Sequence, residues 1–217
     1  MIDCGTDWRG LVPRLAPTAI VLTHAHPDHV GGLAEGAPCP VYASRETWDL
    51  IEGYPIEYRC RLALRKPIVI GGLRFEAFPL EHSIRVPTVG YRVSTGGVAF
   101  FYAPDVARIP GASRALRNIS LYIGDGATMT RSMTRRKGRG LIGHATIAGQ
   151  LAWGEKAGVR DAIFTHCGSP IVRGEARALA AALRQLGADF GVEARFACDG
   201  ERLRLSQAGY RWLLRRG

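Results

Sequence analysis

The sequence predicts an α/β fold in which two mixed β-sheets lie between layers of helices, an αββα sandwich. Short apolar runs rich in β-branched residues recur along the chain, as they do in buried strands. Hairpin patterns dominate the middle of the chain, whereas strands and helices alternate towards its end. With 217 residues, of which 47% are hydrophobic and 22% charged, the chain is expected to form one domain over residues 1–217.

The first part of the chain is predicted to contain strand segments at residues 1–5, 19–22 and 40–43. The second is a continuous aliphatic run, typical of a strand that is covered on both faces. A short helix is expected within residues 7–15, where Pro13 interrupts it. Ser44 is a suitable N-cap for a helix that continues to Ile51, and residues 53–66 show no clear pattern.

Two hairpins are predicted in the middle of the chain. Their strands are expected to cover residues 68–70 with 73–78, and residues 89–93 with 98–102; each turn contains two adjacent glycines. Residues 121–125 form a further apolar strand. Residues 127–140 are polar and rich in arginine and threonine, so a loop is expected there; its basic side chains could attract phosphate or simply be solvated.

The last third of the chain alternates helix and strand patterns. Apolar positions from Ile147 to Ala157 have helical spacing, and they are followed by a strand over residues 162–166 and by an amphipathic helix over residues 175–186 that Gly187 closes. The expected final elements are a hairpin between residues 192–197 and 202–205, and a short basic helix capped by Ser206.

Four side chains able to bind metal ions occur within six residues, directly after the first aliphatic run. They are His24, His26, Asp28 and His29. His24 and His26 are two residues apart, so their rings point the same way on extended backbone, while Pro27 is expected to prevent a helix and to turn the chain. Imidazole and carboxylate ligands suit zinc and similar divalent ions, and four ligands in so short a stretch favour two ions over one.

Later apolar strands also end on polar residues, namely His82, Asp105, Asp125 and His166. Because buried strands are stiff, groups at their ends can be held with the precision that a metal site requires. Each of these residues could instead be a core or turn residue, and Pro104 before Asp105 is compatible with a turn. The recurrence of the pattern favours a shared metal site.

The string His24-x-His26-x-Asp28-His29, followed by three isolated ligands, resembles the metallo-β-lactamase-fold hydrolases in order and spacing. The resemblance covers essentially the whole chain and implies an αββα four-layer sandwich with a binuclear site in the cleft between the sheets. It implies that one ion is held by His24, His26 and His82, that the other is held by Asp28, His29 and His166, and that Asp105 bridges them. Zinc is the first expectation, with manganese or iron as alternatives.

Within this superfamily, His144 in the segment 143–146, located 22 residues before His166, resembles the ribonuclease Z and cyclic-phosphate phosphodiesterase branch. The gap of roughly 23 residues between His82 and Asp105 leaves no room for the tRNA-gripping arm of many ribonuclease Z enzymes. A small anionic phosphodiester is therefore the expected substrate, and nucleic acid stays open. The family usually has an N-terminal hairpin before the strand that ends at Asp3. The chain lacks this hairpin, which implies either a truncated reading frame or an uncovered sheet edge that a homodimer would cover.

The expected mechanism is hydrolysis by a hydroxide that bridges the two ions. Asp28 would ligate one ion and accept a hydrogen bond from this hydroxide, and His144 would hold a phosphoryl oxygen or protonate the leaving alkoxide. Alternatively, His144 could merely cap a helix. Asp3 is expected to be structural and to orient a ligand histidine, and Asp125 is open between a loop role and a similar supporting role.

Composition bounds the remaining possibilities. The formal charge is +10 and the isoelectric point is near 9.9, which favours anionic partners such as phosphate esters or nucleic acid. The five cysteines are scattered without a Cys-x-x-Cys pair, so a disulfide framework is not expected. No long apolar run or signal peptide is recognisable, so we expect a soluble, cytoplasmic protein without a membrane partner. Two other functions remain open: a lactonase or β-lactamase type of acyl hydrolase, and a non-catalytic nucleic-acid-binding module.

Overall fold

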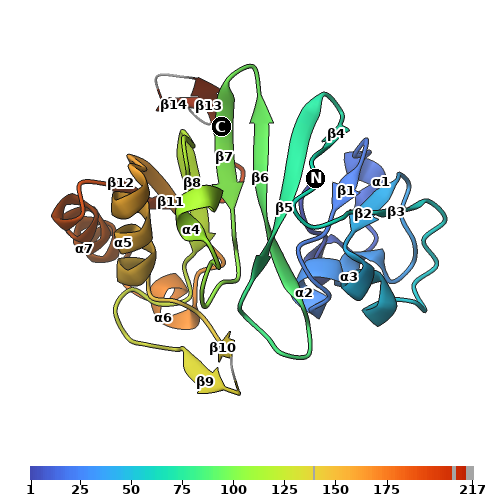
Figure 1. Ribbon diagram of the computed structural model, residues 1–217, viewed down its shortest axis with the longest axis horizontal. Helices are drawn as coiled ribbons and strands as arrows, with labels where there is room; N and C mark the ends of the chain where they lie inside the picture. Colours follow the sequence, from blue (N-terminus) through green and yellow to red (C-terminus); the bar gives the residue numbers. More distant parts are fainter. Residues whose placement is uncertain (139, 207–208, 214–217) are drawn as a thin grey trace.

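The computed structural model describes residues 1–138, 140–206 and 209–213. A seven-stranded sheet and a three-stranded sheet are packed together, and helices cover the outer face of each, which gives the four layers of the predicted αββα sandwich (Figure 1). The larger sheet is mixed, as predicted, whereas both strand pairs of the smaller sheet are parallel. None of the described helices is long and apolar enough to cross a membrane.

The smaller sheet has the order β1-β2-β3 and is formed by the first part of the chain. Its strands are β1 (Ile20–Val21), β2 (Val41–Ala43) and β3 (Arg59–Arg61), and its neighbouring helices are η1 (Thr6–Trp8), α1 (Val12–Leu15), α2 (Pro27–Val30), η2 (Gly31–Leu33) and α3 (Arg45–Leu50). The expected helix over residues 7–15 is divided into two short turns, and Pro13 lies in the first turn of α1, where a missing N–H is tolerated. Ser44 caps α3 as predicted, since its hydroxyl accepts a hydrogen bond from the Thr47 N–H.

The larger sheet has the order β12-β11-β8-β7-β6-β5-β4, and both predicted hairpins lie in it. Its strands are β4 (Ile68–Ile70), β5 (Leu73–Leu80), β6 (Thr88–Thr95), β7 (Val98–Tyr102), β8 (Leu121–Asp125), β11 (Asp161–Thr165) and β12 (Glu193–Phe196). The helices that follow these strands are α4 (Ala112–Ala115), α5 (Ile147–Ala157), α6 (Ser169–Val172) and α7 (Ala176–Asp189). The ends of β5, β7, β8 and β11 point to the same lower edge of the molecule (Figure 1).

Three expectations for the second half of the chain are wrong. The expected loop over residues 127–140 contains a short hairpin of β9 (Arg135–Lys137) and β10 (Gly140–Ile142). Helix α7 does not end at Gly187 but passes through it. Glycine is required at this position for packing, because a side chain would collide with the Val192 carbonyl and with Ala194. Finally, the expected hairpin between residues 192–197 and 202–205 does not form, because β12 pairs with β11. Strand β13 (Arg202–Ser206) pairs instead with β14 (Gly209–Leu213), where a basic helix was expected.

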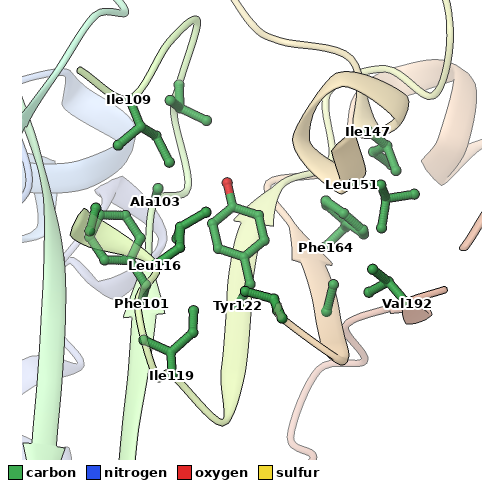
Figure 2. Packing of buried hydrophobic residues seen from close by; sticks show 14 of the residues in the cluster. Phe101, Ala103, Ile109, Leu116, Ile119, Tyr122, Ile147, Leu151, Phe164 and Val192 are labelled. Atoms are coloured by element: carbon green, nitrogen blue, oxygen red, sulfur yellow. The ribbon is translucent and has the colours of Figure 1, made fainter. Parts of the chain in front are cut away.

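Three hydrophobic clusters separate the layers. The largest lies between the larger sheet and its helices, where Phe101, Tyr122 and Phe164 from neighbouring strands meet Leu116 and Leu151 (Figure 2). A second cluster fills the space between the two sheets, and a third lies between the smaller sheet and helices α1 and α3. Burying all three sets fixes the strands rigidly, so the residues at the strand ends inherit defined positions.

Tyr91 connects the two sheets. Its ring is fully buried in the cluster between the sheets, and its hydroxyl donates a 2.5 Å hydrogen bond to the backbone carbonyl of Leu22, directly after β1. The bond therefore fixes the end of β1 against β6 on the opposite sheet.

We expect Tyr91→Phe to lower the free energy of unfolding by about 1–3 kcal/mol, because the buried Leu22 carbonyl loses its side-chain donor. Urea denaturation would measure the change, with Tyr58→Phe as the control, since Tyr58 is exposed and its loss should cost less than about 0.5 kcal/mol. Equal stability of the two variants would contradict this role.

Glu81 connects three segments that meet below the larger sheet. Its carboxylate pairs with both the Nε and the Nη2 of Arg108 and accepts a 3.1 Å hydrogen bond from the Leu141 N–H in β10. Its backbone exchanges hydrogen bonds with residues 107 and 108. One side chain thus joins the end of β5, the segment after β7 and the β9–β10 hairpin.

We expect Glu81→Ala to release the β9–β10 hairpin from this junction. Amide hydrogen exchange of Leu141 should then become at least tenfold faster, because its hydrogen-bond acceptor is gone. Glu46→Ala, in the exposed face of α3, should leave this exchange rate unchanged. Unchanged protection of Leu141 in the Glu81 variant would show that the hairpin is held by other contacts.

Candidate metal centre

All six histidines of the chain gather in one cluster. The centroid of each imidazole ring lies 4.1–5.7 Å from the centroids of at least two others. The residues in this cluster are His24, His26, His29, His82, His144 and His166. Side chains that are up to 142 residues apart in the sequence therefore share one site.

Each ligand candidate is delivered by the end of a strand or by the turn that follows it. His24 and His26 follow β1, and His82 and His166 follow β5 and β11 directly or within two residues. Asp28 and His29 lie in the one-turn helix α2, so the expectation that Pro27 prevents a helix is wrong. Pro27 is the first residue of α2, the position at which proline starts a helix instead of breaking one.

The Asp105 carboxylate occupies the middle of the cluster. Its Oδ1 lies 3.5 Å from His82 Nε2 and 3.6 Å from His166 Nε2, and its Oδ2 lies 2.7 Å from His29 Nε2 and 4.0 Å from His24 Nε2. The carboxylate is almost completely buried. His144 Nδ1 also lies 3.6 Å from Oδ1, so five imidazoles lie within 4.0 Å of one negative charge.

The described residues contain five groups of three possible metal ligands, and two of these groups include neither Asp105 nor His144. In each group, one donor atom per residue lies within 4.8 Å of the others. The first group consists of His24, His26 and His82, and the second consists of Asp28, His29 and His166. These are the two sets that the resemblance implied, so the structure brings together all seven predicted ligands.

Hydrogen bonds fix the protons of the central imidazoles on Nδ1. The Thr23 hydroxyl donates to the Asp3 carboxylate, so the 2.9 Å contact of His24 Nδ1 with Thr23 Oγ1 requires His24 to be the donor. His29 Nδ1 donates to Asp3 Oδ2 at 2.8 Å, and His82 Nδ1 donates to the Gly143 carbonyl at 3.0 Å. In a neutral imidazole, this arrangement leaves the lone pair of Nε2 directed to the centre.

His144 is held by a second buried carboxylate. Its Nδ1 donates a 2.7 Å hydrogen bond to Asp125 Oδ2, and Asp125 is itself fixed by the N–H groups of Val106 and Ala127. The helix that follows is capped by Thr146 and not by His144, so the capping alternative is wrong. Asp125 therefore supports a site residue.

Burial and charge shift the pKa values of these groups in opposite directions in the metal-free site. Burial and the neighbouring His29 lower the pKa of His24 to about 2, so His24 stays neutral. Burial also disfavours a charged His29, but the carboxylates of Asp105 and Asp3 outweigh it and raise the pKa to about 10. A positive charge next to Asp105 is consequently favoured. Although burial opposes it, His29 and His166 lower the pKa of Asp105.

Two site residues have strained backbones. Asp3 and His166 adopt left-handed conformations, with φ of 57° and 51°, which residues other than glycine rarely adopt. The Asp3 N–H donates a hydrogen bond to the Val21 carbonyl in β1. Two residues later, Gly5 packs so closely on Asp28 that a Cβ on Gly5 would lie 2.0 Å from the Asp28 carbonyl oxygen. Such strain is common where side-chain direction matters for function.

A cavity of about 1,000 Å³ opens beside His144 and His166. One wall is formed by residues 128–133 and the other by residues 168–171, and Arg131 is the charged residue among the wall residues. The cavity therefore places a mixed polar and apolar space next to the histidine cluster, with room for a small substrate.

The residues fit divalent metal ions. His29 Nε2 and Asp105 Oδ2 are buried and only 2.7 Å apart, yet neither has a partner in hydrogen-bonding geometry among the residues that the structure describes. Buried polar atoms that converge without bonding to each other are expected where a cation binds between them. Together with imidazoles whose Nδ1 protons are held by hydrogen bonds to outer groups, this donor set suits a divalent ion.

Sequence reasoning missed two supporting residues. Thr23 connects Asp3 to His24, and its only signal in the sequence is a hydroxyl directly before the first ligand. Gln150 bonds the Tyr122 hydroxyl and both backbone groups of Asp125. Its signal is a polar residue on the buried face of a helix, between Ile147 and Leu151.

Several known proteins are similar to this chain in sequence or in structure. The relatives include Ribonuclease Z of Mycobacterium marinum, 25% identical over 83% of this chain and 81% of that protein, and Ribonuclease Z of Mycobacterium bovis BCG, 25% identical over 48% of this chain. The chain spans about half the length (51%) of the latter relative. A solved structure of a diphosphatase from the PhnP family has a TM-score of 0.64 and 24% identity over 92% of this chain and 76% of its own; at this identity the likeness concerns the fold.

The family assignment comes from a match that covers residues 1–167 of this chain. Residues 1–167, which include every residue of the histidine cluster, match the model of the beta-lactamase superfamily domain. The chain therefore belongs to the beta-lactamase superfamily.

Proposed function

We propose that this protein is a metal-dependent phosphodiesterase whose centre holds two divalent ions, with zinc as the first expectation. The observation that carries the proposal is the buried Asp105 carboxylate, which lies between two groups of metal-binding side chains. One ion would be held by His24, His26 and His82, the other by Asp28, His29 and His166, and Asp105 would contact both.

Bound divalent ions supply a nucleophile at neutral pH, because they lower the pKa of water to about 7, and they offset charge on phosphoryl oxygens. The chain supplies orientation. The Asp28 side chain is 61% exposed at the mouth of the centre and lies 3.3 Å from His166 and 3.5 Å from His29. It would accept a hydrogen bond from the attacking water and direct the water towards phosphorus.

His144 would act on the other side of the phosphate. Its Nδ1 is occupied by the hydrogen bond to Asp125, so Nε2 is the nitrogen that can hold a phosphoryl oxygen or give a proton to the leaving alkoxide. Its ring lies at the cavity beside His166, with the two rings stacked at 5.5 Å. His144 would therefore contact the substrate, although it is not one of the residues proposed to hold either ion.

Two observations favour a phosphodiester as the substrate. The names of the relatives, Ribonuclease Z and a diphosphatase, support phosphate chemistry. Arg131 in the wall of the cavity and the exposed Arg135, Arg136 and Lys137 in β9 place positive charge near the centre, which favours an anionic substrate. Both small and nucleotide-derived diesters agree with these features.

We expect the zinc- or manganese-loaded protein to hydrolyse bis(p-nitrophenyl) phosphate much faster than a lactone or a β-lactam. With a diester whose leaving group is an alkoxide, His144→Ala should lower kcat by about 10²–10⁴-fold while the metal content stays at the wild-type level, because the proton donor is lost but both donor groups remain. His26→Ala should lose metal and activity together. Elemental analysis and steady-state kinetics would measure these changes.

Glu46→Ala, exposed in α3, serves as the control and should retain full activity and metal content. Turnover of the lactone without turnover of the diester would contradict the proposed reaction. Full diesterase activity in His144→Ala would contradict the role of His144 alone.

A further inference from the structure

A second group of charged residues lies on the outer face of the larger sheet. A pocket of about 200 Å³ lies between β5, β6 and the segment after α4, and it shares no residue with the metal centre. It is lined by Arg65, Glu76, Phe78, Arg92, Arg114, Arg117 and Asn118. Phe78 packs in the cluster between this sheet and its helices, whereas the adjacent Ala77 packs between the two sheets, which places the pocket on the face away from the smaller sheet.

Two of the guanidinium groups are held in place by the fold. Arg92 donates hydrogen bonds to the backbone carbonyls of Ala115, Arg117 and Asn118. Arg65 lies over the Phe78 ring, 3.6 Å from its centroid. Because these groups are positioned before any ligand arrives, little side-chain entropy is lost on binding.

Charge in the pocket is unbalanced. Glu76 is the only carboxylate in its lining, and it lies 3.4 Å from Arg65. In the described ranges, neither Arg114 nor Arg117 forms an ion pair, and both are exposed. Burial lowers the pKa of Arg92 even though Glu76 opposes the shift. Four positive charges thus face one negative charge in a small volume, an arrangement that a bound anion would stabilise.

The size and the donors of the pocket indicate the class of anion. A volume of about 200 Å³ is below the roughly 300–1,000 Å³ of common ligand pockets, so it suits one compact group. Guanidinium groups bind phosphate through paired N–H donors. We propose that Arg65, Arg92, Arg114 and Arg117 form a phosphate-binding site separate from the metal centre, which accepts free phosphate or a phosphate group of a larger molecule.

The test uses the zinc-loaded chain of 217 residues and follows its backbone amides by NMR during titration with inorganic phosphate. We expect saturable shifts at residues 115–118 that are resolved from any shifts at the metal centre. Arg114→Ala/Arg117→Ala should weaken this binding at least tenfold and leave hydrolysis of bis(p-nitrophenyl) phosphate unchanged. Arg202→Ala/Arg204→Ala in β13 removes the same charge from exposed positions outside the pocket and should leave the affinity unchanged.

Two further experiments complete the test. One variant is expected to bind phosphate more tightly, which a misfolded protein would not do, and a second probe identifies the source of the phosphate. Glu76→Gln should tighten phosphate binding severalfold, since the repelling carboxylate is removed; weaker binding would contradict the proposal. If a phosphorothioate DNA decamer, but not inorganic phosphate, shifts residues 115–118, and the shift is lost in Arg114→Ala/Arg117→Ala, the site accepts phosphodiesters of a strand. Absence of shifts at residues 115–118 with both probes would overturn the proposal.

Discussion

The arrangement of the whole site depends on one buried charge, the carboxylate of Asp105. Almost no water reaches it, and burying an unpaired carboxylate is costly. Five imidazoles surround its two oxygens at 2.7–4.0 Å. His24 stays neutral at this place, whereas a protonated His29, whose pKa is raised to about 10, offsets the charge of Asp105 in the metal-free site. Bound cations would take the place of that proton and offset the same charge.

Two carboxylates at the outside of the histidine cluster fix the orientation of three of its imidazoles. Asp3 fixes His29 and, through Thr23, also His24, while Asp125 fixes His144. Both carboxylates are buried, so neither can exchange its partners for water. Gln150 anchors the backbone of Asp125 to α5 and thereby to the hydrophobic core. The packing of the sandwich therefore also fixes the orientation of the metal-binding side chains.

The sequence was most informative where chemistry and strand pattern coincide. Apolar runs before His24, His82 and His166 indicated both the strands and their ends, since burial on both faces leaves a continuous pattern. β3 could not be predicted because two of its three residues are exposed arginines. Gly187 was a misleading stop signal, because its missing side chain serves the packing of α7 on β12. Pairings between distant strands depend on tertiary contacts that no local pattern contains.

The central claim is that strand ends from both sheets create two adjacent metal positions around Asp105. Anomalous diffraction at the zinc absorption edge, recorded from crystals of the zinc-loaded protein, tests it most directly. The account predicts two peaks, one among His24, His26 and His82 and the other beside His29 and His166. A single peak away from Asp105, or no peak within the histidine cluster, would contradict it.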